Sequence, residues 1–275
     1  MVRGPASRII SHLVYGEVAT ALKASSVLCL PMGSMEQHGP HLPLNTDFVI
    51  AEALTRSIVV HWGDKHDLWQ LPAVPFGLSR EHAWAPGTMS LTVSGMNAYL
   101  CDLGAEIVRA LPARNLLIVN GHGGNRGILE AVTRELSSDF GLNIATLHLG
   151  AMMSPDTDIS IPEIHAGIDE TSVMLAIAPE LVRRETMATL QPSPGGEAVK
   201  ALVLDPAASY PWNSDDPRIS ASGIMGDPRG ASAAHGETVI ARVVEGAGAI
   251  IQRLKNNAAG SVAPESRVER PAKKA

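Results

Sequence analysis

The sequence is poor in cysteine, in aromatic side chains and in long apolar runs. Its 275 residues include two cysteines, Cys29 and Cys101, and aromatic residues make up 4% of the chain. Two cysteines cannot build a multi-disulfide framework or a four-thiolate zinc site, and both lie in apolar runs, so we interpret them as reduced core residues. No stretch approaches the roughly 18 apolar residues of a membrane span, and the N-terminus lacks the apolar segment of a signal peptide. We therefore expect a cytoplasmic protein without a membrane partner.

Positive charge is also in short supply, because 22 Lys and Arg residues face 28 Asp and Glu residues, a net charge of −6 with histidine neutral. This balance argues against a nucleic-acid partner. A hydrophobic content of 45% over this length is enough for one large core. We expect a single domain over residues 1–259. Residues 260–275 have little to bury and are expected to form a disordered tail.

Apolar β-branched runs alternate with segments of helical period. This alternation predicts an α/β fold with a mostly parallel sheet covered on both faces. The predicted strands are Val27 to Met32, Leu68 to Phe76, Asn115 to Asn120 and Asn143 to Leu149. The predicted helices are Asp47 to Val60, a segment with an apolar stripe from Met96 to Leu111, Arg126 to Ser138, Thr171 to Val182 and Ala233 to Lys255. Residues 191–228 are rich in Pro, Gly, Ser and Asp, which predicts long loops with room for short strands.

A polar segment after the first predicted strand, residues 33–47, contains Glu36, His38 and Asp47. In an extended loop, residues two apart project to the same side, so Glu36 and His38 can reach one metal centre or two adjacent ones. Taken singly, the histidine could hydrogen-bond the backbone and Asp47 could cap a helix. Their combination in a loop with glycines and prolines favours metal binding.

A second segment, V-N-G-H-G-G-N at residues 119–125, lies between a predicted strand and a predicted helix. Its glycines leave His122 as the one large functional side chain at the end of the strand. A phosphate-binding nest at the helix N-terminus is the alternative, but neither G-x-x-x-x-G-K-[ST] nor G-x-G-x-x-G is present. The segment therefore favours His122 as a ligand.

Two further segments contain histidines near predicted element ends. Residues 163–172 place His165 five positions before Glu170, which alone would be an ordinary acidic residue in a first helical turn. In residues 79–88, His82 and Trp84 could line a pocket or lie in solvent.

The candidate ligands are carboxylates and imidazoles without a thiolate, a set that suits Zn²⁺, Mn²⁺ or Fe²⁺. An Asp shared between two ions is typical of two-metal hydrolytic centres, in which water becomes the nucleophile. A protein nucleophile is not evident, because the chain has no G-x-S-x-G motif and neither cysteine adjoins a histidine. These residues predict a metal-dependent hydrolase.

Three motifs, G-S-M-E-Q-H-G-P-H-L-P-L-N-T-D, V-N-G-H-G-G-N and H-A-G-I-D-E-T-S, occur in this order. With them, the chain from about Val27 to Arg253 resembles the creatininase (creatinine amidohydrolase) family. The resemblance implies a single three-layer α/β/α domain, a centre of two divalent metal ions and hydrolysis of unusual amide C–N bonds. It also implies a homo-oligomer, often a hexamer.

The resemblance assigns metal ligands residue by residue. Glu36 and His122 would bind one ion, His38 the other, and Asp47 would bridge them. Creatininase itself has a glutamate where this chain has Gly124, so the second ion needs another carboxylate.

Glu170 is the candidate for that carboxylate, as in the G-H-G-G-N branches of the family, and we predict that it also takes part in catalysis. His165 matches a histidine placed for proton transfer and is predicted to be the general acid. His82, Trp84 and Gly123 are candidate substrate contacts.

The sequence therefore predicts a dinuclear amidohydrolase, with Zn²⁺ as the first choice of metal, acting on a lactam, cyclic amide or formamide. Creatinine is disfavoured, because the tryptophans that creatininase closes over it have no counterpart between Leu149 and Glu163. One alternative is a peptide-trimming hydrolase like the mycofactocin branch of the family. A more distant one is a non-catalytic protein that binds a phosphorylated metabolite through Gly121 to Asn125.

Overall fold

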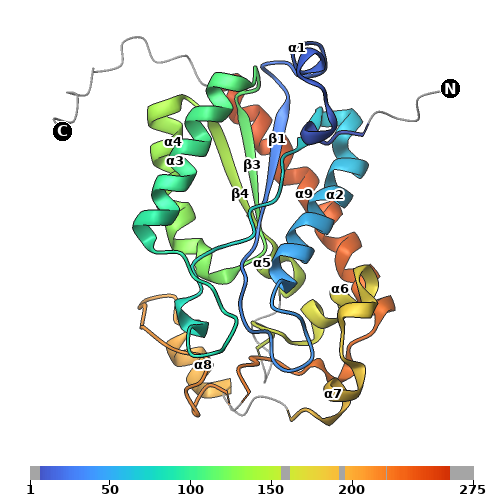
Figure 1. Cartoon of the computed structure of the whole chain (residues 1–275), viewed down its shortest axis with the longest axis vertical. Helices are drawn as coiled ribbons and strands as arrows, with labels where there is room; N and C mark the ends of the chain where they lie inside the picture. The colour runs from blue at the N-terminus through green and yellow to red at the C-terminus, as the bar shows by residue number, and fades with distance from the viewer. Residues whose placement is uncertain (1–6, 156–161, 192–195, 221, 261–275) are drawn as a thin grey trace.

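A sheet of four parallel strands forms the centre of the protein (Figure 1). The computed structural model describes residues 7–155, 162–191, 196–220 and 222–260. Within them the strand order is β2-β1-β3-β4, with bounds Val27–Met32 for β1, Leu68–Gln70 for β2, Asn115–Asn120 for β3 and Asn143–His148 for β4. Val27 pairs with Leu68 on one side and with Asn115 on the other, and Asn115 pairs with Asn143. All four strands therefore end at the same edge of the sheet.

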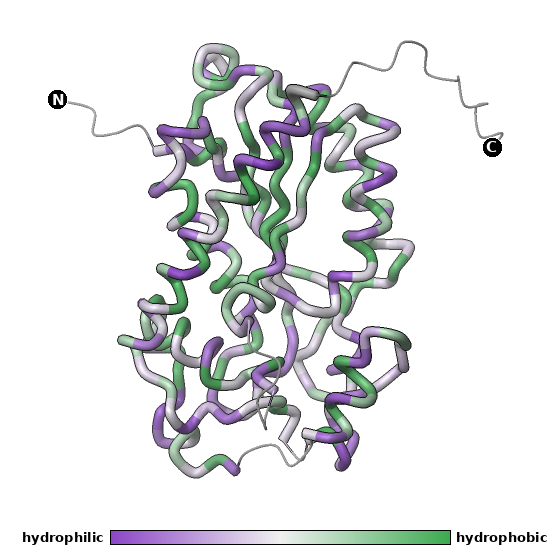
Figure 2. Tube along the Cα trace, turned by 180° about the vertical axis from the view of Figure 1, so that it is seen from behind, coloured by the Kyte–Doolittle hydropathy of each residue, from purple (hydrophilic) through white to green (hydrophobic). Residues whose placement is uncertain are grey.

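Helices cover both faces of this sheet. One face packs against α2 (Thr46–His66), α6 (Ile168–Ile177) and α9 (Ala233–Gly260), and the other against α3 (Val93–Ala110) and α4 (Arg126–Phe140). Val27 and Cys29 of β1 belong to the first core, and Leu28 and Leu30 to the second, as the period of a strand requires. The strands run as hydrophobic segments through the middle of the molecule (Figure 2). The three-layer α/β/α fold expected from the sequence is confirmed.

The remaining helical segments are short and lie mostly around the ends of the sheet. They are α1 (Val18–Ala21), α5 (Leu149–Met153), α7 (Arg184–Thr189), α8 (Gly196–Leu202) and the 3₁₀ turns Ile10–His12, Tyr15–Glu17, Arg80–His82, Gly123–Asn125, Pro179–Leu181 and Pro228–Gly230. The described part of residues 191–228 consists of α8, the last of these turns and loops, as the composition predicted, without a regular strand. The tail beyond residue 260 lies outside the described residues.

Proline explains two of the sequence predictions that were wrong. The strand predicted to reach Phe76 ends at Gln70, because Pro72 and Pro75 cannot donate to a ladder; Val74 alone still forms a bridge, to Met32. The helix predicted to reach Val182 ends at Ile177, before Pro179 begins a 3₁₀ turn.

Two other boundaries also differ. The helix predicted to end at Val60 continues to His66, and the strand predicted to reach Leu149 ends one residue earlier, where α5 begins. Both cysteines are free, but Cys101 is half-buried rather than a full core residue.

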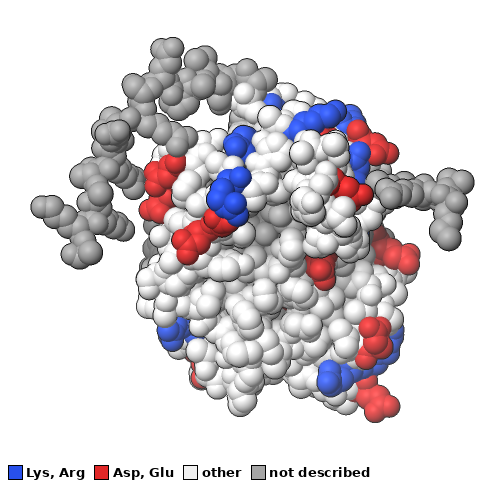
Figure 3. All heavy atoms as spheres, turned by 45° about the horizontal axis from the view of Figure 1, so that its top comes forward, with Lys and Arg blue, Asp and Glu red and all other residues white. Residues whose placement is uncertain are grey.

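The molecular surface is mixed in charge where Figure 3 displays it. Basic and acidic side chains lie beside one another there, and most of the visible surface is uncharged. Among the described residues, no helix combines the length and the apolar character needed to cross a bilayer.

Candidate metal centre

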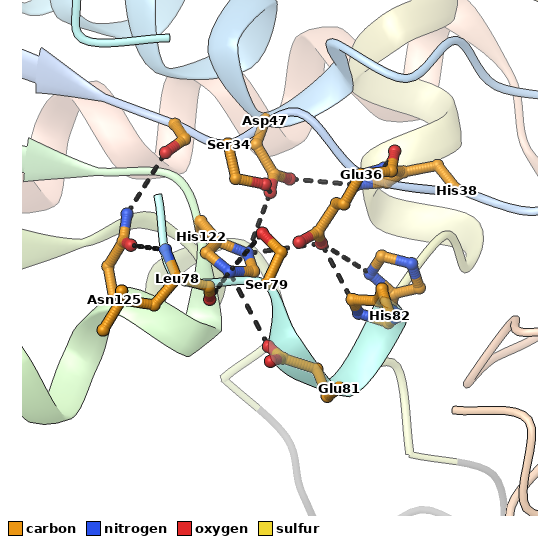
Figure 4. A network of polar contacts seen from close by, with 12 residues as sticks. Ser34, Glu36, His38, Asp47, Leu78, Ser79, Glu81, His82, His122 and Asn125 are labelled. Carbon is orange, nitrogen blue, oxygen red and sulfur yellow. Dashed lines mark hydrogen bonds and ion pairs between the residues drawn. The ribbon is translucent and has the colours of Figure 1, made fainter. Parts of the chain in front are cut away.

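The loops that follow β1, β2 and β3, together with the start of α6, bring carboxylates and imidazoles into one cluster at the carboxyl edge of the sheet (Figure 4). Three groups in this cluster have ligand atoms within 4.8 Å of one another. They are Glu36 with His38 and His165, Glu36 with Glu81 and His122, and His38 with Asp47 and Glu170. This edge is where parallel α/β sheets place their ligand sites.

Glu36 lies at the middle of the cluster and is fully buried. Its Oε1 atom lies 3.2 Å from Nδ1 of His122, 3.5 Å from Nε2 of His82 and 3.6 Å from Nδ1 of His165. Neither carboxylate oxygen has a hydrogen bond of good geometry. Buried carboxylates without hydrogen bonds are costly, so these two oxygens are suited to a cation.

Asp47 faces two imidazoles with its two oxygens. Oδ1 lies 2.9 Å from Nε2 of His38, and Oδ2 lies 3.0 Å from Nδ1 of His122 and accepts a hydrogen bond from Ser34. The residue is the second of α2, where the helix dipole stabilises a carboxylate. Its two oxygens are thus directed to two sides, as the bridging role predicted from the resemblance requires.

His122 has its tautomer set by the backbone. Its Nε2 atom lies 2.7 Å from the carbonyl oxygen of Leu78, which can only accept, so Nε2 carries the proton. In the neutral imidazole, Nδ1 then presents a lone pair toward Glu36 and Asp47. Asn125 fixes this geometry, because its side chain accepts from Leu78 N–H and donates to Gly33 C=O, which joins the loops after β1 and β2 to the loop after β3.

Glu170 enters the cluster from the first turn of α6 and accepts a 2.6 Å hydrogen bond from the backbone N–H of Ala166. Ala166 has φ +56°, a left-handed conformation that is unfavourable for a residue with a Cβ atom. This strained turn lets His165 and Glu170 both face the centre. The next residue, Thr171, contacts Nε2 of His41 at 2.9 Å, which places His41 behind the cluster.

Gln37 organises a second layer of contacts. Its amide orientation is fixed because Oε1 accepts from Gly39 N–H at 2.9 Å, so Nε2 can only donate. Nε2 lies 3.0 Å from Gly223 C=O and 2.9 Å from Nδ1 of His82. His82 Nδ1 therefore accepts, and its proton is on Nε2, the atom that faces Glu36.

His165 has the opposite arrangement. Its Nε2 lies 2.8 Å from the backbone carbonyl of Gln37 and must donate, which leaves the lone pair on Nδ1, toward Glu36. The rings of His82 and His165 stack with centroids 4.2 Å apart. Ser214 completes this layer, since its hydroxyl contacts Nδ1 of His82 at 2.7 Å and accepts from Nε1 of Trp84 at 2.8 Å.

The acids and the histidines of the cluster shift one another's pKa values. Burial alone would raise the pKa of Asp47, but the facing His38 and His122 outweigh it and lower that pKa well below its usual range. Burial opposes protonation of His38, yet Asp47 raises its pKa to about 9. For Glu170, burial and the charge of Asp47 outweigh His38 and raise the pKa to about 7. Burial, with the charge of His38, lowers the pKa of His165.

The structure brings together all of the metal and catalytic residues predicted from the sequence: Glu36, His38, Asp47, His122, His165 and Glu170. Of the three candidate substrate contacts, His82 lies beside Glu36. Trp84 is 45% exposed and donates a hydrogen bond to Ser214, and Gly123 is exposed, with open space where a Cβ would project.

Three residues of the cluster were not singled out from the sequence, namely Gln37, Glu81 and Ser214. Gln37 lies between two predicted ligands and Glu81 precedes His82, a predicted substrate contact, so proximity in sequence was the available signal. Ser214 belongs to the loop-rich segment and is brought in by contacts across more than 130 residues.

Comparison with known proteins identifies the family. A family model described as creatinine amidohydrolase matches residues 11–251. The chain belongs to the creatininase family. A mycofactocin precursor peptide peptidase from Mycolicibacterium smegmatis is 32% identical over 82% of this chain and 85% of its own length. A creatinine amidohydrolase from Pseudomonas putida is 25% identical over 87% and 94%.

Solved creatininases share the fold. A Zn–Zn form aligns with a TM-score of 0.71 at 23% identity, covering 91% of this chain and 98% of the other. A Mn form aligns with a TM-score of 0.69 at 24% identity, with the same coverage. The creatininase relatives are hydrolases of amide C–N bonds, so the amidohydrolase class predicted from the sequence is confirmed.

Proposed function

We propose that this chain is a dinuclear metal-dependent amidohydrolase whose ions are held by Glu36, His38, Asp47, His122 and Glu170. The observation that carries the proposal is the carboxylate of Glu36, which is fully buried among imidazoles without a hydrogen bond and lies next to an aspartate that faces two histidines. Carboxylate oxygens and imidazole nitrogens suit Zn²⁺ first, and Mn²⁺ or Fe²⁺ as alternatives. Solved creatininases with Zn–Zn and Mn forms support divalent ions here.

Two divalent ions at these ligands would lower the pKa of a water molecule and polarise the carbonyl under attack. The protein supplies the proton chemistry around them. His165, neutral and with its Nδ1 lone pair toward the centre, accepts at Nδ1 the proton that the attacking water loses and delivers it to the departing nitrogen. Glu170, in the first turn of α6, takes part in catalysis beside His165. His82 donates from Nε2 toward the substrate oxygen, which gives the predicted substrate contact a defined role.

The substrate we propose is a small non-standard amide, such as a lactam, a cyclic amide or a formamide. Peptide trimming is the second candidate, and the observation that favours it is the 32% identity to mycofactocin precursor peptide peptidases over most of both chains. The homo-oligomeric state, the cytoplasmic location and the substrate roles of Trp84 and Gly123 stay predictions.

The test is the metal content per subunit of protein purified without chelator, for the wild type and for Glu170→Ala. We expect about two equivalents in the wild type and about one in the variant, because one ion loses a carboxylate. The loaded enzyme should then hydrolyse members of a panel of lactams, formamides and short peptides. A wild type that takes up neither Zn²⁺ nor Mn²⁺ would refute the proposal and favour the phosphate-binding alternative, which predicts thermal stabilisation by phosphate.

A further inference from the structure

Glu81 reaches the metal centre from the 3₁₀ turn Arg80–His82, which follows β2. Its Oε1 atom lies 3.7 Å from Nε2 of His122, and a carboxylate oxygen lies within 4.8 Å of ligand atoms of both Glu36 and His122. The side chain is 16% exposed. In Figure 4 it points at His122 from the side opposite Asp47.

Gly124 explains why a carboxylate can stand there. A Cβ atom at position 124 would lie 2.5 Å from Oε1 of Glu81, 2.5 Å from Nε2 of His122 and closer still to the carbonyl oxygen of Leu78. Any side chain at this position would collide with all three. The space beside His122 is therefore available to Glu81 because residue 124 has no side chain.

The backbone of Glu81 is held in place rather than left in a free loop. Its carbonyl oxygen accepts from Ser214 N–H at 2.9 Å and lies 3.3 Å from the Ser214 hydroxyl, and Ser214 is fully buried. The following residue, His82, is fixed by Gln37 and Ser214 as described above. The carboxylate thus approaches the centre from an anchored position.

The negative charges near Glu81 favour a cation. Three carboxylates surround His122: those of Glu36, Asp47 and Glu81 lie 3.2, 3.0 and 3.7 Å from its ring nitrogens. Both oxygens of Glu36, the neighbour of Glu81 in the group, are buried without a hydrogen bond. A divalent ion between these two carboxylates would satisfy Glu36 and remove the repulsion at the same time.

We propose that Glu81 is a further carboxylate ligand of the metal centre, binding the ion that Glu36 holds. This proposal rests on the proposed function and enlarges its ligand set. With Glu81, the four carboxylates of the centre equal the charge of two divalent ions.

The test compares metal binding by the full-length wild type, Glu81→Gln and the control Glu130→Gln, which removes an exposed carboxylate on α4. After removal of ions with a chelator, Zn²⁺ and Mn²⁺ binding is measured by competition with a chromophoric chelator. We expect Glu81→Gln to bind one ion with unchanged affinity and the other at least roughly 10- to 100-fold more weakly. The control should match the wild type. Two ions bound by Glu81→Gln with wild-type affinity would overturn the proposal.

Co²⁺ spectra separate a ligand from a residue that acts through His122. Loss of a ligand changes the coordination of one Co²⁺ ion, so we expect the visible bands of Glu81→Gln to change in intensity and position. Bands identical to those of the wild type would overturn the ligand role even if affinity falls. A wild type without ions would overturn the proposed function and this inference together, whereas two ions in the wild type and an unchanged variant would overturn this inference alone.

Discussion

The side-chain amide of Gln37 lies 2.9 Å from Nδ1 of His82, and this contact determines which nitrogen of His82 carries the proton. Because the amide nitrogen can only donate, the proton of His82 is directed at Glu36. The backbone carbonyl of the same Gln37 holds His165 in the opposite tautomer. One residue that is not itself a candidate ligand thus orients two imidazoles of the centre.

This relationship predicts that Gln37→Met will lose activity while keeping its ions. Methionine fills similar space but cannot donate to His82, so we expect turnover to fall by roughly 10- to 100-fold, as for other groups that orient catalytic or ligating residues. Metal content should remain that of the wild type. The measurement is kcat and KM on a cleaved amide, with metal analysis of the same samples.

Gln252→Met, on the surface of α9, is the matched control and should retain full activity. Gln37→Glu offers a second comparison, because a carboxylate would accept a hydrogen bond from Nδ1–H of His82 and so favour the other tautomer. Full activity in Gln37→Met would contradict the orienting role. Loss of ions in that variant would instead indicate that Gln37 maintains the ligands themselves.

Metal affinity should rise with pH. In the absence of ions, Asp47 outweighs burial and raises the pKa of His38 to about 9, and the pKa of His122 is raised as well. A ligand imidazole must be neutral, so an ion that binds near pH 7 has to displace these protons. The apparent affinity should therefore increase by about tenfold per pH unit for each displaced proton and level off above about pH 9.

Competition with a chelator at several pH values gives the slope, and calorimetry in buffers of different ionisation enthalpy counts the protons released. An affinity that does not change between about pH 6 and pH 8 would show that the histidines are already neutral before the ions arrive.

We expect a single added methyl group at Gly236 to disrupt the packing between α6 and α9. A Cβ atom there would collide with the backbone carbonyl of Ser172 on α6, the helix that begins with the segment containing Glu170. We expect Gly236→Ala to lower the free energy of unfolding by about 1–3 kcal/mol, as overpacked core positions do. Urea denaturation measures this value.

Gly127→Ala is its control, because a Cβ at this position of α4 meets nothing within 4 Å. Alanine has the higher helix propensity, so this variant should be as stable as the wild type or more stable by up to about 1 kcal/mol. Equal stability of the two variants would show that α9 can shift away from α6 at little cost.

Local pattern predicted the framework of the fold well. The strands β1 and β3 have the predicted bounds, because each is a short apolar run between turn-forming residues and is buried along its whole length. The strand prediction was wrong where a segment is apolar enough for a strand but its backbone cannot form the hydrogen bonds of one. Residues 71–76 are apolar enough for a strand, but the prolines in them cannot complete a ladder.

The cluster was predictable to the extent that its members are close in sequence. Glu36, His38 and Asp47 share the segment of residues 33–47, the glycines around His122 marked it as a ligand, and the motif resemblance added Glu170. The contact between Ser214 and His82 joins residues 132 positions apart and depends on how a long loop packs. A pattern of local spacing holds no information about such a contact, and for the same reason it could not indicate that Glu81 fills the space left by Gly124.

The wide separation of these residues along the chain has a consequence for folding. Glu36 and Asp47 lie in one segment, Glu81 in a second and Glu170 in a third, and the four carboxylates become neighbours only when β1, the turn after β2 and α6 have packed together. Without ions, the native state holds close together like charges that the unfolded chain keeps apart. The repulsion between them lowers the free energy of unfolding. Ions that bind the native state alone would offset this repulsion. The free energy of unfolding of this protein would then depend on the concentration of metal ions around it.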